Sequence, residues 1–423
     1  MVLEGMSEKS IEARKQSIIQ KKLTSLAEMT ERSKFEMKRQ TKTGRNMIML
    51  LVAAFLFCVF LVSCAKNDNK PTEDHTIALN DCRIEHDEQY GGVYIRCPIE
   101  EFQKLGFDYG DSVNITFSNQ YSMNDIPYHN GDYVDLGKPL LVGYTGHTDL
   151  EVHHYHGDDL WQIAALDDSM TVSVVLNEKG KYQEEQIING LVYSNEQGDL
   201  PDEVFANFRA VNVGNLKENL VYRSSSPCDN QINRAAVVDK LCQEANIQYV
   251  INLADSKDDI EAYISQKDFN SPWYLELYQR DHVCALDMEI NINQEQLLHK
   301  LAEGFTQMAQ NEGPYLIHCL EGKDRTGFVC MILEALTGAS VDEIKQDYMV
   351  TYKNYYSITE QTDAELYSKI RSFNIDRMLT FLTNGEDVDP VKRDQLSEYA
   401  EKFLVSQGMN PADVQTLKDK LCR

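Results

Sequence analysis

The chain has 423 residues, 42% of them hydrophobic, which is enough for two or three domains with buried cores. Its formal net charge is −26 at pH 7. Nucleic-acid binding needs a basic face, so this charge argues against DNA or RNA as the main partner. The charge is also uneven, because residues 1–46 hold 11 lysines and arginines against 6 acidic residues.

The N-terminal region has the order of an export signal. A basic stretch from Met37 is followed by the uncharged apolar segment 47–62 and then by Leu-Val-Ser-Cys, ending at Cys64. These four residues resemble a bacterial lipoprotein box, which implies cleavage before Cys64 and a lipid on that cysteine. The alternative is a single-pass membrane anchor, since such a segment can just span a bilayer. In either case the basic flank predicts that residues 65–423 lie at the outer face of a bacterial membrane.

Residues 1–36 do not fit a signal peptide, because they are polar with only a weak helical pattern. Met37 is a natural start for the signal. We therefore expect translation to begin there, with residues 1–36 a start-site artefact or a cytoplasmic tail. Residues 65–76, rich in Asn, Lys, Asp, Pro and Thr, are expected to form a tether.

Residues 77–200 are predicted to form a small, mainly β domain. Apolar runs such as 112–117 and 171–176 alternate with turn signals such as Tyr-Gly-Gly and Asn-Gly-Asp. Cys82 and Cys97 flank a predicted hairpin, where export would permit a disulfide that the spacing alone does not establish. No pattern here indicates a function, so a binding module, a docking unit and a spacer all remain open.

One stretch of this domain gathers residue types that bind metals. They are His147, Asp149, His153, His154, His156, Asp158 and Asp159. None of the usual zinc spacings is present, and two adjacent histidines on a strand point to opposite faces. We therefore interpret the stretch as a polar loop or an edge strand, and we predict no metal and no other cofactor.

From residue 201 to residue 423 the pattern changes to alternating strands and helices. Buried strands are predicted within 220–227, 247–255 and 314–319. Helices are predicted within 233–246, 294–313, 326–338, 341–356 and 394–408. This alternation predicts an α/β fold, with a parallel sheet flanked by helices, after the β domain.

The sequence HCLEGKDRTG, residues 318–327, carries the chemistry. A buried strand leads into Cys319, and an apolar helix begins after Arg325. Such a strand–loop–helix directs backbone N–H groups and the positive end of a helix into one concavity, which binds anions. The site would favour a thiolate at Cys319, while Arg325 can hold two oxygens of a phosphate. Together they indicate phosphoryl transfer to sulfur.

The same stretch resembles the signature loop of the cysteine-dependent phosphatases, H-C-x-x-G-x-x-R-[ST]-G. Its Gly-Lys-Asp-Arg-Thr-Gly version is similar to the bacterial tyrosine-phosphatase branch, which includes phosphoinositide-active and secreted virulence enzymes. Residues 205–227 are similar to the N-terminal motif of that branch, although Ala210, Val211 and Ala254 depart from its pattern. The resemblance covers residues 200–420 and implies a cysteine-phosphatase-like fold.

The resemblance implies a role for each residue of the loop. Cys319 attacks phosphorus to form a phosphocysteine, and Arg325 binds the oxygens. The expected substrate-binding residues are His318, Leu320, Glu321, Gly322, Lys323, Thr326 and Gly327. Thr326 would stabilise the leaving thiolate, whereas His318 would order the loop rather than act as a base. Asp324 is the first candidate for the general acid and Asp287 the second, the alternative for Asp287 being a helix or turn cap.

We therefore predict an exported, lipid-tethered, metal-independent protein-tyrosine or dual-specificity phosphatase. Its partners would be a phosphorylated protein and a membrane, with no nucleic acid. The first alternative is a phosphoinositide or inositol-phosphate phosphatase with the same site, because Lys323 at the pocket mouth would favour polyanions. The second is a lipoprotein binding module with a degenerate phosphatase domain, against which the intact Cys319, Asp324 and Arg325 argue. A sulfurtransferase is disfavoured because its common loop is one residue shorter.

Overall fold

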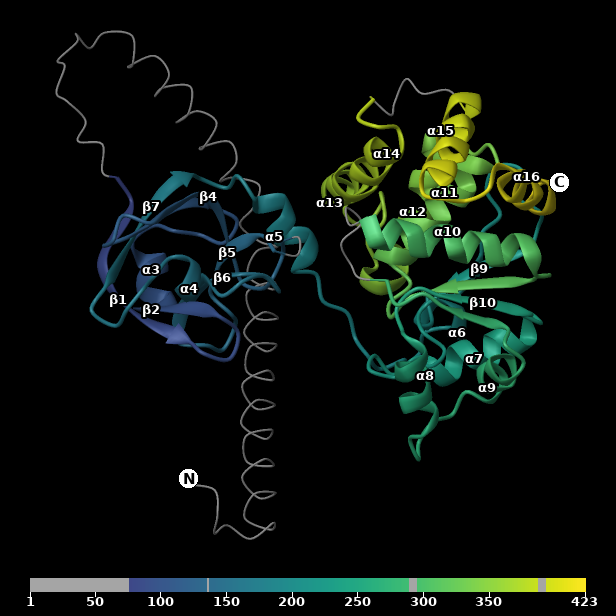
Figure 1. The fold of residues 1–423 in the computed structure, drawn as a ribbon, viewed down its shortest axis with the longest axis horizontal. Helices are drawn as coiled ribbons and strands as arrows, with labels where there is room; N and C mark the ends of the chain where they lie inside the picture. Colours follow the sequence, from purple (N-terminus) through teal and green to yellow (C-terminus); the bar gives the residue numbers. More distant parts are fainter. Residues whose placement is uncertain (1–75, 135–136, 289–294, 387–392) are drawn as a thin grey trace, which may run out of the picture. The chain divides into compact units, whose positions relative to one another are not determined.

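The computed structural model describes residues 76–134, 137–288, 295–386 and 393–423 (Figure 1). The predictions for the N-terminal region, including the start at Met37, the apolar segment 47–62 and the lipid on Cys64, fall outside these residues. Among the described helices, none combines the length and apolarity needed to cross a bilayer.

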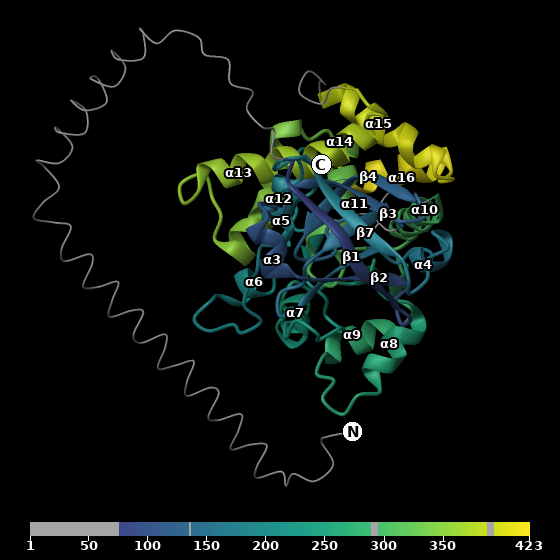
Figure 2. The ribbon, with the colours of Figure 1, turned by 90° about the vertical axis from the view of Figure 1, so that its left-hand side faces the viewer.

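The first part of the described chain is a closed β-barrel with the hydrogen-bonded strand order β1-β2-β6-β5-β4-β3-β7 (Figure 2). The strands are β1 (Ala78–Asp87), β2 (Gly92–Pro98), β3 (Ser112–Phe117), β4 (Ser122–His129), β5 (Pro139–Val142), β6 (Asp149–His154) and β7 (Thr171–Glu178). The associated helices are α3 (Ile99–Lys104), α4 (Leu160–Ile163) and α5 (Gln183–Asn189). The predicted strands 112–117 and 171–176 are thereby confirmed.

Alternating side chains fill the barrel. Val113, Ile115 and Phe117 of β3 are buried in its core, as are Val172 and Val174 of β7. This is the period-two pattern of strands with one face on a core. The barrel interior is therefore packed with side chains.

Two predictions for this region can be compared with the barrel. Cys82 on β1 and Cys97 on β2 are free thiols, although the register that pairs Ile84 with Ile95 would also bring them opposite each other. The interpretation of the histidine-rich stretch as an edge strand is wrong for Asp149–His154. This segment is β6, which pairs with β2 on one side and β5 on the other, because closure of the barrel leaves it no free edge.

The second part of the described chain is built on a sheet with the order β11-β10-β12-β9-β8. Its strands are β8 (Arg209–Ala210), β9 (Val221–Ser224), β10 (Tyr249–Asn252), β11 (Val283–Ala285) and β12 (Tyr315–His318). The neighbours from β11 to β9 run parallel, and β8 is antiparallel to β9. The predicted α/β class is confirmed.

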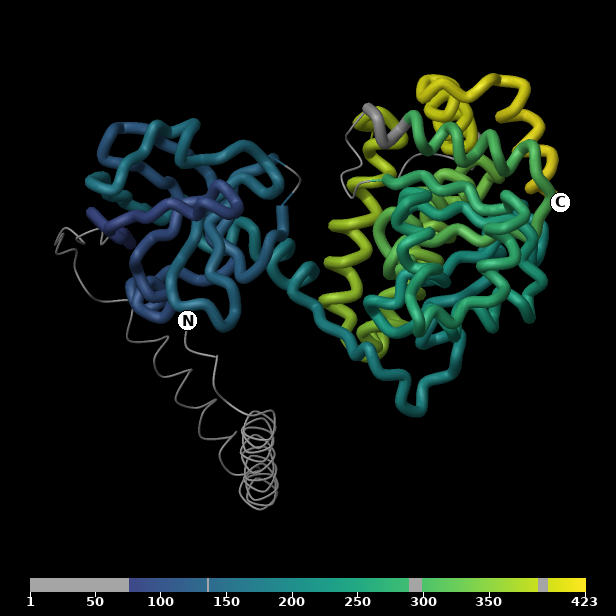
Figure 3. The backbone as a smooth tube through the Cα atoms, turned by 60° about the horizontal axis from the view of Figure 1, so that its bottom comes forward, coloured from purple at the N-terminus to yellow at the C-terminus, as the bar shows by residue number. Residues whose placement is uncertain are grey.

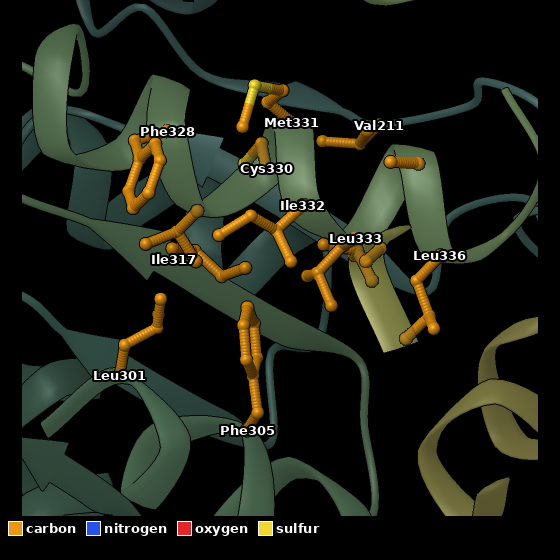
Figure 4. Close-up of a cluster of buried hydrophobic side chains, with 14 of the residues drawn as sticks. Val211, Leu301, Phe305, Ile317, Phe328, Cys330, Met331, Ile332, Leu333 and Leu336 are labelled. Atoms are coloured by element: carbon orange, nitrogen blue, oxygen red, sulfur yellow. The ribbon is translucent and has the colours of Figure 1, made fainter. Parts of the chain in front are cut away.

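Helices cover both faces of this sheet, which explains why β10 and β12 are buried along their whole length. Ile251 and Ile317 face the core that contains α10 (Glu295–Gln310) and α11 (Asp324–Leu336). Figure 4 shows Ile317 of β12 between side chains of these two helices. Val250 and Leu316 face the opposite core, which contains α7 (Ala235–Glu244) and α9 (Pro272–Gln279).

The remaining elements complete this α/β part. They are α6 (Asp202–Phe205), α8 (Lys257–Ile264), α12 (Val341–Tyr356), α13 (Ala364–Ile370), a π-helical turn (Arg371–Ile375), α14 (Asp376–Leu382), α15 (Arg393–Ser406) and α16 (Pro411–Leu421). The C-terminal helices return to the core, with α15 against α11 and α16 against α10 (Figure 3). A capping box between Ser340 and Glu343 fixes the start of α12, the helix that supports the candidate site.

Candidate active site

The sequence 318–327, here called the Cys319 loop, lies at the carboxyl edge of the parallel strands. β12 ends at His318 and α11 begins at Asp324, so the chain turns between them. His318 is in register with Asn252 at the end of β10 and with Ser224 at the end of β9. Segments that follow these two strands therefore flank the loop, which is the usual ligand position in an α/β sheet.

The backbone of the loop is held by its carbonyl oxygens. Ser226 N donates to Leu320 O at 3.0 Å, Tyr355 Oη to Glu321 O at 2.6 Å, and Arg223 Nη2 to Gly322 O at 3.0 Å. Among the described residues, none accepts a hydrogen bond from the amide N–H groups of residues 320–323. With its carbonyls bound from outside, the loop leaves a row of N–H donors for an anion, next to the N-terminus of α11.

Gly322 is required for this path. Its φ is 69°, a left-handed conformation that side chains disfavour. A Cβ on Gly322 would lie 2.2 Å from the carbonyl oxygen of Ser224, which is backbone and has no side-chain freedom to move away. The loop therefore packs against the end of β9 at a distance that only glycine permits.

A buried charge network anchors the loop to α12. Asp347 pairs with Arg209 at 3.1 Å and with Arg223 at 2.8 Å, and all three side chains are largely buried. Burial alone would raise the pKa of Asp347, but the two guanidinium groups outweigh it and lower that pKa to about 2. Asn207 joins this network by accepting from Arg209 and donating to Gly322 O at 3.2 Å.

The structure brings Cys319 and Arg325 to the two ends of the row of N–H donors. Cys319 is 4% exposed, and Arg325 is half-buried and donates through Nη1 to Met288 O at 2.9 Å. Thr326 Oγ1 is buried and has no hydrogen-bond partner among the described residues. A thiol, a guanidinium and a free hydroxyl thus share the two ends of one loop.

His318 is not placed to act as a base. Its ring is fully buried, and burial lowers the pKa of His318 to about 3, so the imidazole is neutral at physiological pH. Its Nδ1 lies 3.3 Å from the carbonyl oxygen of Cys319. This contact orders the backbone at the start of the loop.

The two candidate acids differ in their surroundings. Desolvation raises the pKa of Asp324, with the nearby Lys323 opposing this effect. The side chain is still about half exposed, so it can reach a substrate from within the loop. Asp287 is 60% exposed, and its carboxylate lies 3.3 Å from Lys300 Nζ. The carboxylate of Asp287 thus contacts α10.

The Lys323 ammonium is paired with neighbouring side chains. Its ammonium lies 3.2 Å from Glu321, 3.7 Å from Asp324 and 3.4 Å from Tyr356 Oη. The other oxygen of the Glu321 carboxylate accepts a short hydrogen bond from Tyr193. The charge of Lys323 is therefore largely neutralised inside the loop.

Tyr193 itself is held by Arg234. The Arg234 guanidinium lies 4.9 Å from the ring of Tyr193 and 5.1 Å from that of Tyr355, and it donates to the carbonyl of Ser194 at 2.8 Å. A residue that precedes the α/β part of the chain thus reaches the Cys319 loop.

Sequence reasoning missed the residues that support the loop. They are Tyr193, Asn207, Arg209, Arg223, Arg234, Asp347 and Tyr355. Three of them lie within 205–227, whose similarity to a family motif was noted without a role for its polar residues. Cys64 lies outside the described residues. In the described part of the chain, no group of His, Cys, Asp and Glu side chains could hold a metal ion.

Comparison with known proteins decides the family. A sequence model of the tyrosine phosphatase family matches residues 205–423, more than half of the chain. The chain belongs to the tyrosine phosphatase family. The resemblance seen in the sequence is therefore confirmed at the level of the family.

The individual proteins that match the chain do so over less than half of its length. The chain is 44% identical over 46 residues to a protein of Cupriavidus necator named "Putative tyrosine-protein phosphatase". The matched segment covers 11% of this chain and 17% of the relative. The core catalytic domain of the PP-IP phosphatase SIW14 from S. cerevisiae, solved with citrate, is 20% identical. That match covers 44% of this chain and 96% of that domain with a TM-score of 0.24. An uncharacterized conserved protein from Thermotoga maritima is 17% identical over 27% of this chain and 41% of its own, with a TM-score of 0.20.

Proposed function

We propose that residues 201–423 form a cysteine-dependent phosphomonoesterase, most suited to phosphotyrosyl protein. One observation carries this proposal. The carbonyls of the Cys319 loop are bound from outside, while the N–H groups of residues 320–323 have no acceptor among the described residues. With Cys319 at one end of this row and Arg325 at the other, the loop is suited to hold a phosphoryl group beside a sulfur nucleophile.

The reaction proceeds in two displacements. In the first, the Cys319 sulfur attacks phosphorus, the bond from phosphorus to the ester oxygen breaks, and that oxygen takes a proton from the general acid. In the second, water attacks the phosphocysteine and passes a proton to the same carboxylate, while the sulfur–phosphorus bond breaks. The buried Thr326 hydroxyl, which has no partner among the described residues, is available to donate to the departing thiolate.

Asp324 is the better general acid of the two candidates. Its pKa is raised, so a larger fraction of the carboxyl is protonated near neutral pH, and the half-exposed side chain lies within the loop itself. Asp287 is more exposed, and its carboxylate is paired with Lys300 of α10.

The pairing of Lys323 favours a substrate with one phosphate. A free lysine at the pocket mouth would attract inositol polyphosphates through their additional charge. Here Glu321 and Asp324 hold the ammonium, so the attraction for a polyanion is reduced. Phosphotyrosyl peptide is therefore the proposed substrate, and phosphoinositide hydrolysis at the same site is the outcome that an assay must separate from it.

We also propose that the protein is exported and lipid-anchored through Cys64 at the outer face of a bacterial membrane. The basic, apolar and cysteine-ended order of residues 37–64 supports this proposal. Cells that express the chain would be fed an alkyne-labelled palmitate. We expect label on the wild-type chain and none on Cys64→Ala. Equal labelling of the two would refute the lipid site and leave a single-pass anchor.

The covalent intermediate tests the enzyme proposal. The Asp324→Asn variant is mixed with p-nitrophenyl phosphate, quenched in acid and digested for mass spectrometry. Because the variant lacks the carboxylate that accepts the proton of the attacking water, the phosphocysteine should accumulate. We expect a phosphoryl group on the peptide that contains Cys319 and none on peptides with other cysteines. The mechanism would be refuted if the wild type turned over the substrate while neither the wild type nor Asp324→Asn gave a modified Cys319 peptide.

A further inference from the structure

We propose that the outer face of the β-barrel carries a carbohydrate-binding site, built around Glu151, His153 and Asp132. This proposal concerns the barrel alone and does not rest on the proposed phosphatase function. Along β6, Leu150 and Val152 belong to the barrel core, so Glu151 and His153, which alternate with them, point away from it. Polar side chains on that face would ordinarily be solvated.

These two side chains are nevertheless buried. Glu151 is 6% exposed and His153 is 8% exposed. They lie in a cavity of about 640 Å³ together with Asp132 from the segment after β4, and tyrosines line much of its wall. The tyrosines are Tyr90, Tyr94, Tyr144 and Tyr155. A cavity of this volume, with aromatic walls and a few polar groups, has the usual composition of a small-molecule site.

The floor of the cavity is fixed by a chain of polar contacts. His153 Nε2 lies 3.2 Å from Asp132 Oδ1, and His153 Nδ1 lies 3.3 Å from Glu151 Oε1. Tyr144 Oη donates to Asp132 Oδ1 at 2.6 Å. Burial lowers the pKa of His153, but the two carboxylates outweigh it and raise that pKa to about 9. The imidazolium thus neutralises one of the two acidic charges.

The Glu151 carboxylate is the observation that points to a ligand. Glu151 Oε1 is paired with His153 Nδ1 at 3.3 Å, and among the described residues no hydrogen bond to the other carboxylate oxygen is found. A largely buried carboxylate is stabilised by further donors, because each oxygen can accept two hydrogen bonds. A ligand in the cavity would supply the missing donors from hydroxyl or amino groups.

A sugar fits these features better than a cation. His153 already offsets much of the negative charge, which weakens the attraction for an ammonium group. Asn130 and Thr145 also line the cavity and add donors beside the acceptors. Hydroxyl groups both donate and accept, so a polyol satisfies both kinds of partner. Tyr90, 71% exposed at the cavity, offers a flat apolar surface against which a sugar ring can stack.

Binding of three trisaccharides to the full-length chain in detergent tests the proposal. Chitotriose, maltotriose and cellotriose are titrated by calorimetry against the wild type and the variants Glu151→Gln and Tyr90→Ala. Glu85→Gln is the matched control, since Glu85 also lies on the outside of the barrel but does not line the cavity. We expect at least one sugar to bind. Glu151→Gln should weaken its binding by about tenfold or more, the size of one lost charged hydrogen bond, and Tyr90→Ala should weaken it through the loss of the stacking surface.

Several results would overturn the proposal. They are a wild type that binds none of the three sugars, affinity unchanged by Glu151→Gln, an equal loss in Glu85→Gln, or saturable binding of tetramethylammonium in place of the sugars. Thermal melting establishes whether the variants fold. If Glu151→Gln does not fold, the exposed position of Tyr90 makes Tyr90→Ala the deciding variant.

Discussion

Arg223 and Asp347 lie 124 residues apart in the sequence, yet their side chains meet at 2.8 Å in the interior of the α/β part. Arg223 also donates to the carbonyl oxygen of Gly322. The pair therefore connects β9, α12 and the Cys319 loop through one buried guanidinium. The geometry of the loop depends on this connection as much as on its own sequence.

Replacing Asp347 should destabilise the protein strongly. Asp347→Asn leaves Arg209 and Arg223 buried without their carboxylate, and breaking such a pair costs about 3–5 kcal/mol. Urea unfolding followed by circular dichroism measures the change. The control is Asp342→Asn, since Asp342 is on the same helix with a side chain that is 77% exposed. A loss as small as that of the control would contradict the role of the network.

The same pair predicts how stability depends on acid. The pKa of Asp347 is lowered to about 2 in the folded protein, against an ordinary value near 4 in the unfolded chain. Its contribution is therefore fully present above pH 5 and is lost as pH falls toward 2, by an amount on the order of 2 kcal/mol. The difference in unfolding free energy between wild type and Asp347→Asn should thus shrink between pH 6 and pH 3. A difference that does not change with pH would be inconsistent with a lowered pKa.

Gly322→Ala should abolish phosphatase activity, because the added Cβ would displace the loop from the end of β9. Gly385→Ala is a matched control, since Gly385 has a φ of 87° but none of the described residues has an atom within 4 Å of the added Cβ. Both variants carry the backbone strain of about 1 kcal/mol, and only Gly322→Ala adds the clash. We expect kcat/KM to fall at least about 100-fold in Gly322→Ala alone, as for a misplaced catalytic group. Equal activity in the two variants would show that the close approach is not required.

His318 should make the protein less stable in mild acid. Because its pKa is lowered to about 3, the unfolded chain takes up a proton between pH 6.5 and pH 3 that the folded protein does not. Stability therefore falls with pH in this window, by about 2 kcal/mol between pH 7 and pH 5. His318→Asn should flatten this part of the curve, whereas His282→Asn, at a half-buried position remote in sequence, should not. An unchanged slope in His318→Asn would mean that His318 titrates normally.

Much of the α/β part could be predicted from the sequence because its elements have local signals. The apolar run before Cys319 marks β12, and the apolar run after Arg325 marks α11. Asp347 has no such signal, since a lone acid on an amphipathic helix usually faces solvent. Only the pairing of β9 with β12 brings Arg223 beneath the loop and gives Asp347 its partner.

Closure of the barrel is a second feature that has no local signal in the sequence. Single strands such as 112–117 were predicted from alternation, but closure joins β1 to β7 across the whole domain, and no local pattern encodes it. This is why the interpretation of Asp149–His154 as a polar loop or an edge strand is wrong. The helix α9 was also missed, although Pro272 directly after Ser271 is a typical first helical residue.

Releasing Lys323 should change the substrate preference. Glu321→Gln removes the charge that holds the ammonium, and Tyr193→Phe removes the hydrogen bond that positions Glu321. The ratio of kcat/KM for an inositol polyphosphate to that for a phosphotyrosyl peptide should rise about tenfold in Glu321→Gln and less in Tyr193→Phe. Glu365→Gln, at an exposed glutamate on α13, is the control. A ratio that stays constant would show that Lys323 does not select substrates.

Hydrolysis of a phosphotyrosyl peptide, a phosphoseryl peptide and a phosphoinositide panel in the presence of EDTA tests the central claim most directly. The wild type is compared with Cys319→Ser and with Cys422→Ser, a half-buried cysteine outside the loop. We predict turnover in EDTA that is highest for the phosphotyrosyl peptide, abolished in Cys319→Ser and retained in Cys422→Ser. Turnover that survives in Cys319→Ser, or no turnover of any substrate by the wild type, would contradict a phosphatase that acts through Cys319.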